Sequence, residues 1–157
     1  MSEKIFHLQP WNPALVTTAH KVTRQIHALA PELEVLFMGA AALALPGKND
    51  IDLDILCDAH DVSKYAALLA PVLGELKELN DKTASWSTTI DGFKVDAILS
   101  DPTISHVPKQ QAIFHKLKAN AKLRDHYRQL KESCDGKPYK EYEQHKKAFF
   151  EQVYNSN

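Results

Sequence analysis

The chain has 157 residues, 44% of them hydrophobic and 25% charged, and its formal net charge is −1. These values are ordinary for a globular domain, and the near-neutral charge argues against nucleic acid as a partner. No apolar run is long enough to cross a bilayer and no secretory leader is visible, so we expect a cytoplasmic protein without a membrane partner. Cys57 and Cys134 lie far apart without metal-binding spacing, which predicts reduced thiols.

The charges are unevenly distributed along the chain. Residues 106–157 hold 11 Lys or Arg and 6 Asp or Glu, whereas residues 1–105 hold the remaining 8 and 14. A basic tail beside an acidic region would steer a phosphate-bearing ligand toward the protein. The alternative is that the lysines only form the solvated faces of surface helices, which are often rich in lysine.

The first half of the chain alternates helical and strand patterns. Asn12-Pro13 predicts a helix start, because Asn caps and Pro suits the first helical position. Residues 34–38 predict a buried strand that ends at Gly39, and residues 50–57 alternate acidic and apolar side chains with the period of a strand. A helix from about residue 61 to 69, with a break at Pro71, is expected next.

The second half begins with strands and ends with helices. Residues 75–79 indicate a short strand, and residues 86–99 around Asp91-Gly92 predict a hairpin with a type I′ turn. One long helix is expected from Pro108 to Asp135, and a last helix from Pro138. This order predicts an α+β fold (α/β-like), with a mixed β-sheet flanked by helices and a C-terminal helical pair. We expect a single domain over residues 1–157, with a core at about 10–105 and a helical segment at about 106–154.

The strongest local feature is the acidic strand around Asp52. Because side chains alternate along a strand, Asp50, Asp52 and Asp54 share one face, with neighbouring carboxylates about 6–7 Å apart. Each such pair repels by roughly 2–3 kcal/mol at an effective dielectric of about 20. A bound cation, a proton or strong hydration must relieve this repulsion. An exposed strand face with solvated acids is the alternative interpretation.

The surroundings of this strand favour a metal site. Mg²⁺ or Mn²⁺ accepts carboxylate oxygens and completes its shell with water and substrate phosphates. Upstream, Gly39 and Ala40 form a small-residue turn that lets backbone N–H groups approach a phosphate closely. Downstream, Asp96 places one acid within an otherwise apolar strand. Asp50, Asp52 and Asp96 are therefore the candidate metal ligands.

The pattern of a Gly-ended strand, an Asp-x-Asp strand and a later Asp resembles the nucleotidyltransferase superfamily. Within it, residues 39–52 are similar to the GrpB family, which has Gly-Ser-Thr, Val-Pro-Gly and a Lys before its acidic strand. Residues 127–131 and 142–146 resemble its two C-terminal Tyr-x-x-x-Lys segments, and Pro10-Trp11 also fits. The resemblance covers about residues 8–154.

The resemblance implies a transferase that uses a divalent metal and a nucleoside triphosphate, with an acceptor that the sequence does not identify. Asp50, Asp52 and Asp96 would be catalytic and metal-binding, and the nucleotide would be bound by residues of the preceding loop. Those residues are Gly39, Ala40 and Lys48. A plain turn lysine is the alternative for Lys48.

The sequence departs from the family pattern in two ways. Ala40-Ala41 replaces Ser-Thr, which removes a hydroxyl that contacts the phosphates in nucleotidyltransferases and about 1 kcal/mol of hydrogen bonding. This departure supports a second hypothesis, a non-catalytic module that binds nucleotide or metal. The acidic strand is also fuller than in the family, so the metal-binding pair is either Asp50/Asp52 or Asp52/Asp54. A third hypothesis is a structural or interaction protein.

Several other residues have two interpretations. Four side chains of the tail either line the cleft or pack between two helices with their lysines reaching solvent, and the second interpretation is the more common one. These are Tyr127, Lys131, Tyr142 and Lys146. The eight histidines are scattered without a tight ligand pair, which is typical of surface or half-buried histidines.

Overall fold

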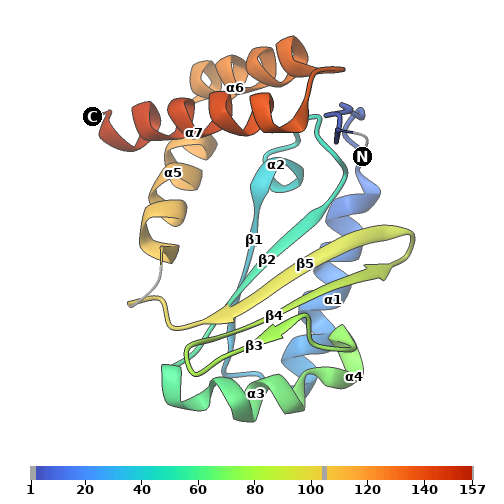
Figure 1. Cartoon of the computed structure of the whole chain (residues 1–157). Helices are drawn as coiled ribbons and strands as arrows, with labels where there is room; N and C mark the ends of the chain where they lie inside the picture. The colour runs from blue at the N-terminus through green and yellow to red at the C-terminus, as the bar shows by residue number, and fades with distance from the viewer. Residues whose placement is uncertain (1–2, 104–105, 157) are drawn as a thin grey trace.

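The structure is a computed structural model that describes residues 3–103 and 106–156. Its five strands form one sheet in the order β1-β2-β5-β4-β3 (Figure 1). The strands are β1 (Glu34–Met38), β2 (Ile51–Leu56), β3 (Glu78–Leu79), β4 (Thr83–Ile90) and β5 (Phe93–Ser100). The α-helices are α1 (Ala14–Leu29), α2 (Gly39–Ala42), α3 (Val62–Leu68), α4 (Ala70–Leu73), α5 (Val107–Ala119), α6 (Ala121–Cys134) and α7 (Tyr139–Asn155).

The sheet is mixed, as the order of elements predicts. β2 pairs with β5 in parallel, whereas β1 with β2, β5 with β4 and β4 with β3 are antiparallel. The predicted hairpin is confirmed, and both turn residues have positive φ (53° at Asp91 and 84° at Gly92), as a type I′ turn requires. The strand expected over residues 75–79 is reduced to the two residues of β3.

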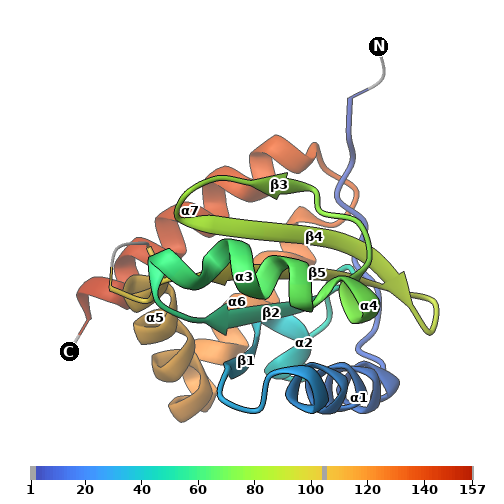
Figure 2. The same cartoon turned by 90° about the horizontal axis from the view of Figure 1, so that it is seen from below.

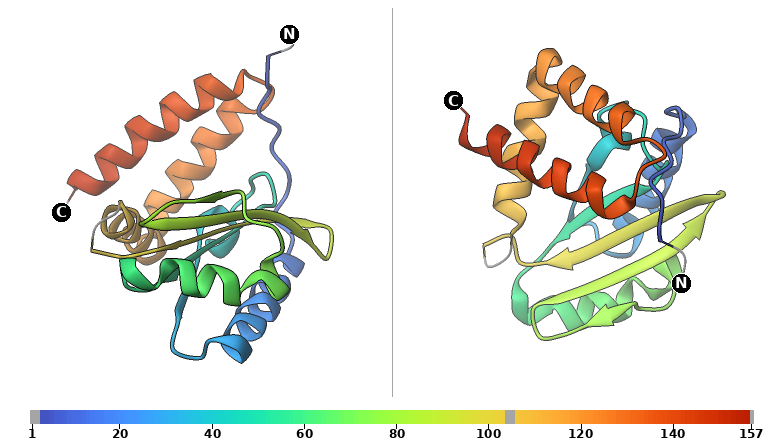
Figure 3. Two further views of the ribbon diagram at one scale, coloured as in Figure 1. Left: turned by 60° about the horizontal axis from the view of Figure 1, so that its bottom comes forward. Right: turned by 45° about the horizontal axis from the view of Figure 1, so that its top comes forward.

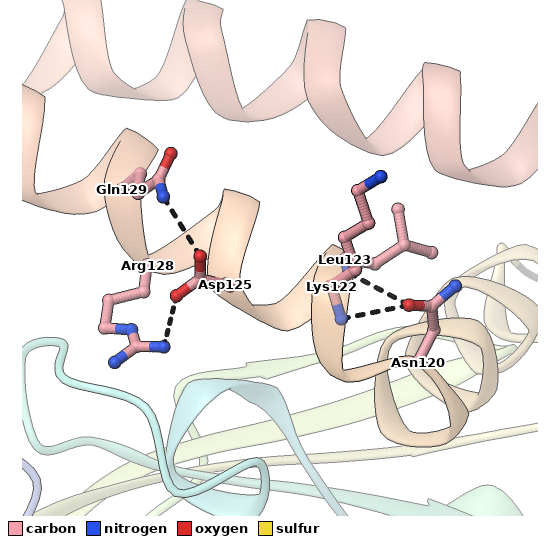
Figure 4. Close-up of polar contacts among 6 residues, drawn as sticks. All are labelled: Asn120, Lys122, Leu123, Asp125, Arg128 and Gln129. Carbon is pink, nitrogen blue, oxygen red and sulfur yellow. Dashed lines mark hydrogen bonds and ion pairs between the residues drawn. The ribbon is translucent and has the colours of Figure 1, made fainter.

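Two helix boundaries differ from the sequence-based prediction. The helix expected over about 61–69 ends at Leu68, and Pro71 lies in the first turn of the separate short helix α4, where its missing N–H has no intrahelical partner to lose. The long helix expected from Pro108 is divided into α5 and α6. At the division, the side chain of Asn120 accepts hydrogen bonds from the backbone N–H groups of Lys122 and Leu123, at 3.0 and 3.2 Å (Figure 4). Asn120 therefore caps a new helix.

Helices cover the sheet from two sides. α1, α3 and α4 pack against one face and form the main core with the apolar sides of β2, β4 and β5 (Figure 2). The alternation along β2 places Ile51, Leu53 and Ile55 in this core. The acidic residues of β2 consequently face the other side of the sheet.

The three C-terminal helices form a second layer on the side of the sheet opposite α1, α3 and α4 (Figure 3). α5, α6 and α7 contact one another and share an apolar cluster with Met38, Leu43 and Leu45. Within the described ranges, no helix is long and apolar enough to span a membrane. Cys57 and Cys134 are both free.

The N-terminal segment, residues 4–9, joins the loop before β2 to the C-terminal helices. Gln9 and Gly47 exchange two backbone hydrogen bonds, of 2.7 and 3.1 Å. A few residues earlier, the backbone N–H of Phe6 donates to the carbonyl of Lys137 at 2.9 Å. This segment therefore fixes the helical layer relative to the loop that carries the candidate site.

We expect Phe6→Ala to reduce the free energy of unfolding by about 3–5 kcal/mol, the usual cost of removing a buried Phe side chain. Phe6 is 1% exposed and its ring stacks on that of Tyr142, with centroids 3.8 Å apart. Leu79→Ala, at a site that is 51% exposed, is the control and should change stability by about 0.5 kcal/mol or less. Urea unfolding followed by tryptophan fluorescence measures both. A smaller loss for Phe6→Ala than for Leu79→Ala would contradict the role assigned to this segment.

Candidate functional site

A cavity of about 930 Å³ lies between the acidic face of the sheet and the C-terminal helices. Its lining comes from β1, β2, β5, the loop between β1 and β2, and all three helices of the tail. Every site residue predicted from the sequence lines this cavity: Gly39, Ala40, Lys48, Asp50, Asp52 and Asp96.

The carboxylates come from two neighbouring strands. Asp52 and Asp96 are register partners on the parallel strands β2 and β5, so their side chains emerge side by side. Asp50 lies one residue before β2 rather than on the strand, yet it lines the same cavity. Asp54 shares the face of Asp52 and pairs in register with Leu36 and Ile98, which are apolar.

Burial and neighbouring negative charges raise the pKa of Asp52 to about 6. Burial is the largest cause, followed by the charges of Asp96 and Asp50, and the charge of Lys146 opposes them. Part of that rise therefore comes from the repulsion between carboxylates that the sequence predicts on this strand. A cation or positively charged ligand group near Asp52 would lower that pKa again.

The structure explains why residue 39 is a glycine, which the sequence alone did not. Its φ is +79°, and a Cβ at this position would overlap Oδ2 of Asp52. The absence of a side chain thus makes room for the Asp52 carboxylate, in addition to exposing the backbone at the start of α2.

Lysines from the loop and the tail face the carboxylates. Lys48 forms an ion pair with Asp50 at 3.7 Å and donates a hydrogen bond to the Tyr139 hydroxyl at 2.9 Å. Burial acts to lower the pKa of Lys48, but the bond to Tyr139 and the nearby carboxylates raise that pKa overall. This lysine is consequently a stable positive charge at the start of β2.

Lys131 is the most unusual side chain of the cavity. It is 3% exposed, and burial, with the positive charge of Lys146, lowers its pKa to about 7. Its Nζ lies 4.7 Å from the centre of the Tyr127 ring, and a Cβ added to Gly47 would lie 3.2 Å from that Nζ. Among the described residues, none forms a hydrogen bond or ion pair with this ammonium group.

The interpretation that the sequence favoured for the tail is therefore only half right. Tyr127 and Tyr142 do pack together, with hydroxyl oxygens 3.4 Å apart, but Lys131 and Lys146 line the cavity instead of only reaching solvent. The Tyr-x-x-x-Lys spacing places each pair on one helix face, which is the signal that points to this arrangement. No comparable signal marks Tyr139, which sequence reasoning missed.

The acidic groups suit a divalent cation that arrives with a phosphate ligand. In residues 3–103 and 106–156, no three His, Cys, Asp or Glu side chains are grouped closely enough to hold a metal ion unaided. Mg²⁺, however, uses one or two carboxylates and completes its shell with water and substrate phosphates. Asp52 and Asp96 provide such a pair, and a cation bound there would balance their negative charges.

Comparisons with known proteins support the fold. No protein-family model and no curated protein matches the chain, so the resemblance to the GrpB family stays a prediction. A solved structure of the Cid1 poly(U) polymerase with MgGTP bound is similar, with 16% identity and a TM-score of 0.54 over 74% of this chain and 41% of that one. A second Cid1 structure, with Mg 3′-dATP bound, has 14% identity and a TM-score of 0.51 over 74% and 40%.

The chain spans about two fifths of the length of these polymerase structures. At this level of identity the likeness concerns the fold alone. The mixed five-stranded sheet flanked by helices is the nucleotidyltransferase-type fold that the sequence predicts.

Gly39→Ala tests the close approach of the backbone to Asp52. The strained φ alone costs about 1–3 kcal/mol for a residue with a side chain, and displacement of the carboxylate adds to that. Gly92→Ala is the matched control, because Gly92 has a φ of +84° but open space around a Cβ. Chemical denaturation should show a larger loss for Gly39→Ala than for Gly92→Ala. Equal losses would mean that Asp52 does not depend on this glycine.

Asp52→Asn should raise the melting temperature by a few degrees at pH 7.5 in EDTA. Because the pKa of Asp52 is higher in the folded chain than the ordinary 3.8, the folded state binds the proton more tightly. Stability therefore falls as pH rises from about 4 to about 6, and the substitution removes that loss. At pH 4 the two proteins should melt alike, and exposed Asp58→Asn should match wild type throughout. A lower melting temperature for Asp52→Asn at pH 7.5 would contradict the assignment.

Proposed function

We propose that the protein is a nucleotidyltransferase that binds a nucleoside triphosphate with Mg²⁺ or Mn²⁺ and transfers the nucleotidyl group to a hydroxyl acceptor. The observation that carries this proposal is the composition of the cavity. Carboxylates from β2 and β5 face lysines from the loop and the C-terminal helices across one cavity. Such a site can neutralise a metal cation on one side and a phosphate chain on the other.

The carboxylates are proposed to bind the metal. Asp50, Asp52 and Asp96 are the proposed ligands, and the bound cations would neutralise charge on the transferring phosphate. Asp96 is half-buried and lines the cavity, where its carboxylate can accept the proton of the acceptor hydroxyl. The pairing of Asp52 with Asp96 in register supports this set.

The lysines are proposed to bind the phosphate chain of the nucleotide. The charges of Lys48, Lys131 and Lys146 affect the pKa values of one another or of Asp52. The three lysines therefore lie in the same part of the cavity. The ammonium group of Lys131 forms no hydrogen bond or ion pair among the described residues, and burial, together with the charges of Lys146 and Lys48, lowers its pKa. A phosphate chain would provide the missing partner and return Lys131 to its charged form.

A non-catalytic module that binds the same nucleotide is the second candidate. Ala40 and Ala41 at the start of α2 offer no hydroxyl for the phosphates, and this observation favours the module. Pyrophosphate release from labelled triphosphate distinguishes the two functions. Release that Asp52→Asn abolishes supports the enzyme, whereas tight metal-dependent binding without release supports the module.

Lys131→Met tests the phosphate side directly. The variant should melt at a higher temperature than wild type without ligand, because a buried charge is removed. Its affinity for MnATP, or for whichever of GTP, CTP and UTP stabilises wild type most, should fall about 10–100-fold, the size of one charged hydrogen bond. Thermal melting over a nucleotide titration measures both effects. Lys122→Met, at an exposed position of the same helix, should match wild type in both.

Three results of this titration would contradict the proposal. The first is the absence of a metal-dependent nucleotide shift in wild type. The second is a nucleotide shift that persists undiminished in Asp52→Asn, and the third is unchanged affinity in Lys131→Met.

A further inference from the structure

Asp54 is a buried acid that the proposed mechanism does not use. It is 9% exposed, it lines the cavity, and its Oδ2 has no hydrogen-bond partner within the part of the chain that the structure describes. Its neighbours across the two adjoining strands are Leu36 and Ile98. An apolar residue would fit such surroundings better, since an unpaired buried carboxylate destabilises the folded chain.

Asp54 lies at the opposite end of the acidic row from Lys48. Lys48 pairs with Asp50 at the start of β2, whereas Asp54 lies four residues further along, about 13 Å at the usual rise of a strand. The charge that acts on the pKa of Asp54 is that of His106 at the start of α5. Burial raises the pKa of Asp54, and His106 partly offsets that rise.

The geometry of phosphoryl transfer gives these two ends different roles. The attacking and leaving oxygens lie roughly in line on opposite sides of the phosphorus. If pyrophosphate leaves toward the lysines, as the proposed function requires, the acceptor must approach from the side of Asp54. The acceptor oxygen forms a bond to the α-phosphorus, the bond from that phosphorus to pyrophosphate breaks, and the hydroxyl proton passes to Asp96.

We propose that Asp54 belongs to the acceptor site and accepts a hydrogen bond from a second donor, a hydroxyl or an amino group, on the carbon next to the attacking hydroxyl. This inference rests on the proposed function. It assigns the acceptor to the vicinal diols and amino alcohols, and it excludes an acceptor with an anionic group beside the attacking hydroxyl. Ile98, which is 38% exposed beside Asp54, offers an apolar contact for the carbon skeleton of such a molecule.

Two kinds of acceptor carry such a second donor: a small polyol or amino sugar, and the terminal ribose of an RNA. Matched probes separate them. The small probes are cyclohexane-1,2-diol, 2-aminocyclohexanol and cyclohexanol, which differ only in the second donor. The RNA probes are an oligoribonucleotide with a terminal ribose and the same oligonucleotide with a terminal 2′-deoxyribose.

The proteins compared are wild type, Asp54→Leu, Asp54→Asn and the control Asp58→Asn. Both Asp54 variants should melt at a higher temperature than wild type, because the unpaired carboxylate is gone, and both should keep the metal-dependent nucleotide shift. In wild type, the probes with a second donor should stimulate pyrophosphate release about tenfold more than their partners without it, the size of one hydrogen bond to a charged group. Asp54→Leu should lose this preference, and Asp58→Asn should keep it.

The outcomes separate this inference from the proposed function. If metal and nucleotide do not raise the melting temperature of wild type, both the proposed function and the role of Asp54 are wrong. If nucleotide does raise the melting temperature of wild type, three results overturn the role of Asp54 alone. They are no preference for the second donor, a preference that survives in Asp54→Leu, and lower melting temperatures of the Asp54 variants. A preference found only with the oligoribonucleotide supports the role of Asp54 and identifies an RNA end as the source, whereas one found with the small probes identifies a polyol or amino alcohol.

Discussion

The crowding of like charges around Asp52 is the constraint on which the rest of the site depends. A strand face that places one carboxylate beside another from the adjacent strand stores repulsion, and burial intensifies it. Gly39 leaves the space that this carboxylate occupies, and the lysines of the tail lie across the cavity from it. On the basic side, the ammonium group of Lys131 forms no hydrogen bond or ion pair with any residue that the structure describes. A ligand that carries cations and phosphates together would balance the charges of the carboxylates and of Lys131. Binding of such a ligand explains why the chain keeps an arrangement that destabilises its folded state.

The fold keeps these opposing groups in place through contacts of the N-terminal segment, whose Phe6 lines the cavity together with Gly47 and Tyr142. The acidic face belongs to the sheet, and the basic face belongs to helices that begin only after β5. The N-terminal segment connects the two layers, because residues 4–9 bond both to Gly47 and to the turn before α7. Phe6 extends this connection by stacking on Tyr142, in the same helix as Lys146. The cavity is therefore a product of tertiary packing rather than of any one motif.

Local patterns in the sequence predict most of the sheet and the acidic half of the site. Alternation identifies β2 and places its acids on one face, and Asp91-Gly92 identifies the hairpin that brings Asp96 beside Asp52. The break at Asn120 was missed because the apolar spacing continues through it, while the decisive cap is a local hydrogen bond. The burial of Lys131 could not be predicted, since a lysine on an amphipathic helix ordinarily reaches solvent, and only the packing of three helices against the loop encloses this one.

The most direct test of this account is the pKa of Asp52, measured by NMR titration of its ¹³C-labelled carboxyl group. Without metal the account predicts a value of about 6. Addition of Mg²⁺ and a non-hydrolysable nucleoside triphosphate should lower that pKa well below its metal-free value, because the bound cation stabilises the carboxylate. An ordinary pKa near 3.8 in the absence of metal, or a raised pKa that metal and nucleotide leave unchanged, would contradict the claim that this site is built for a cation and a phosphate chain.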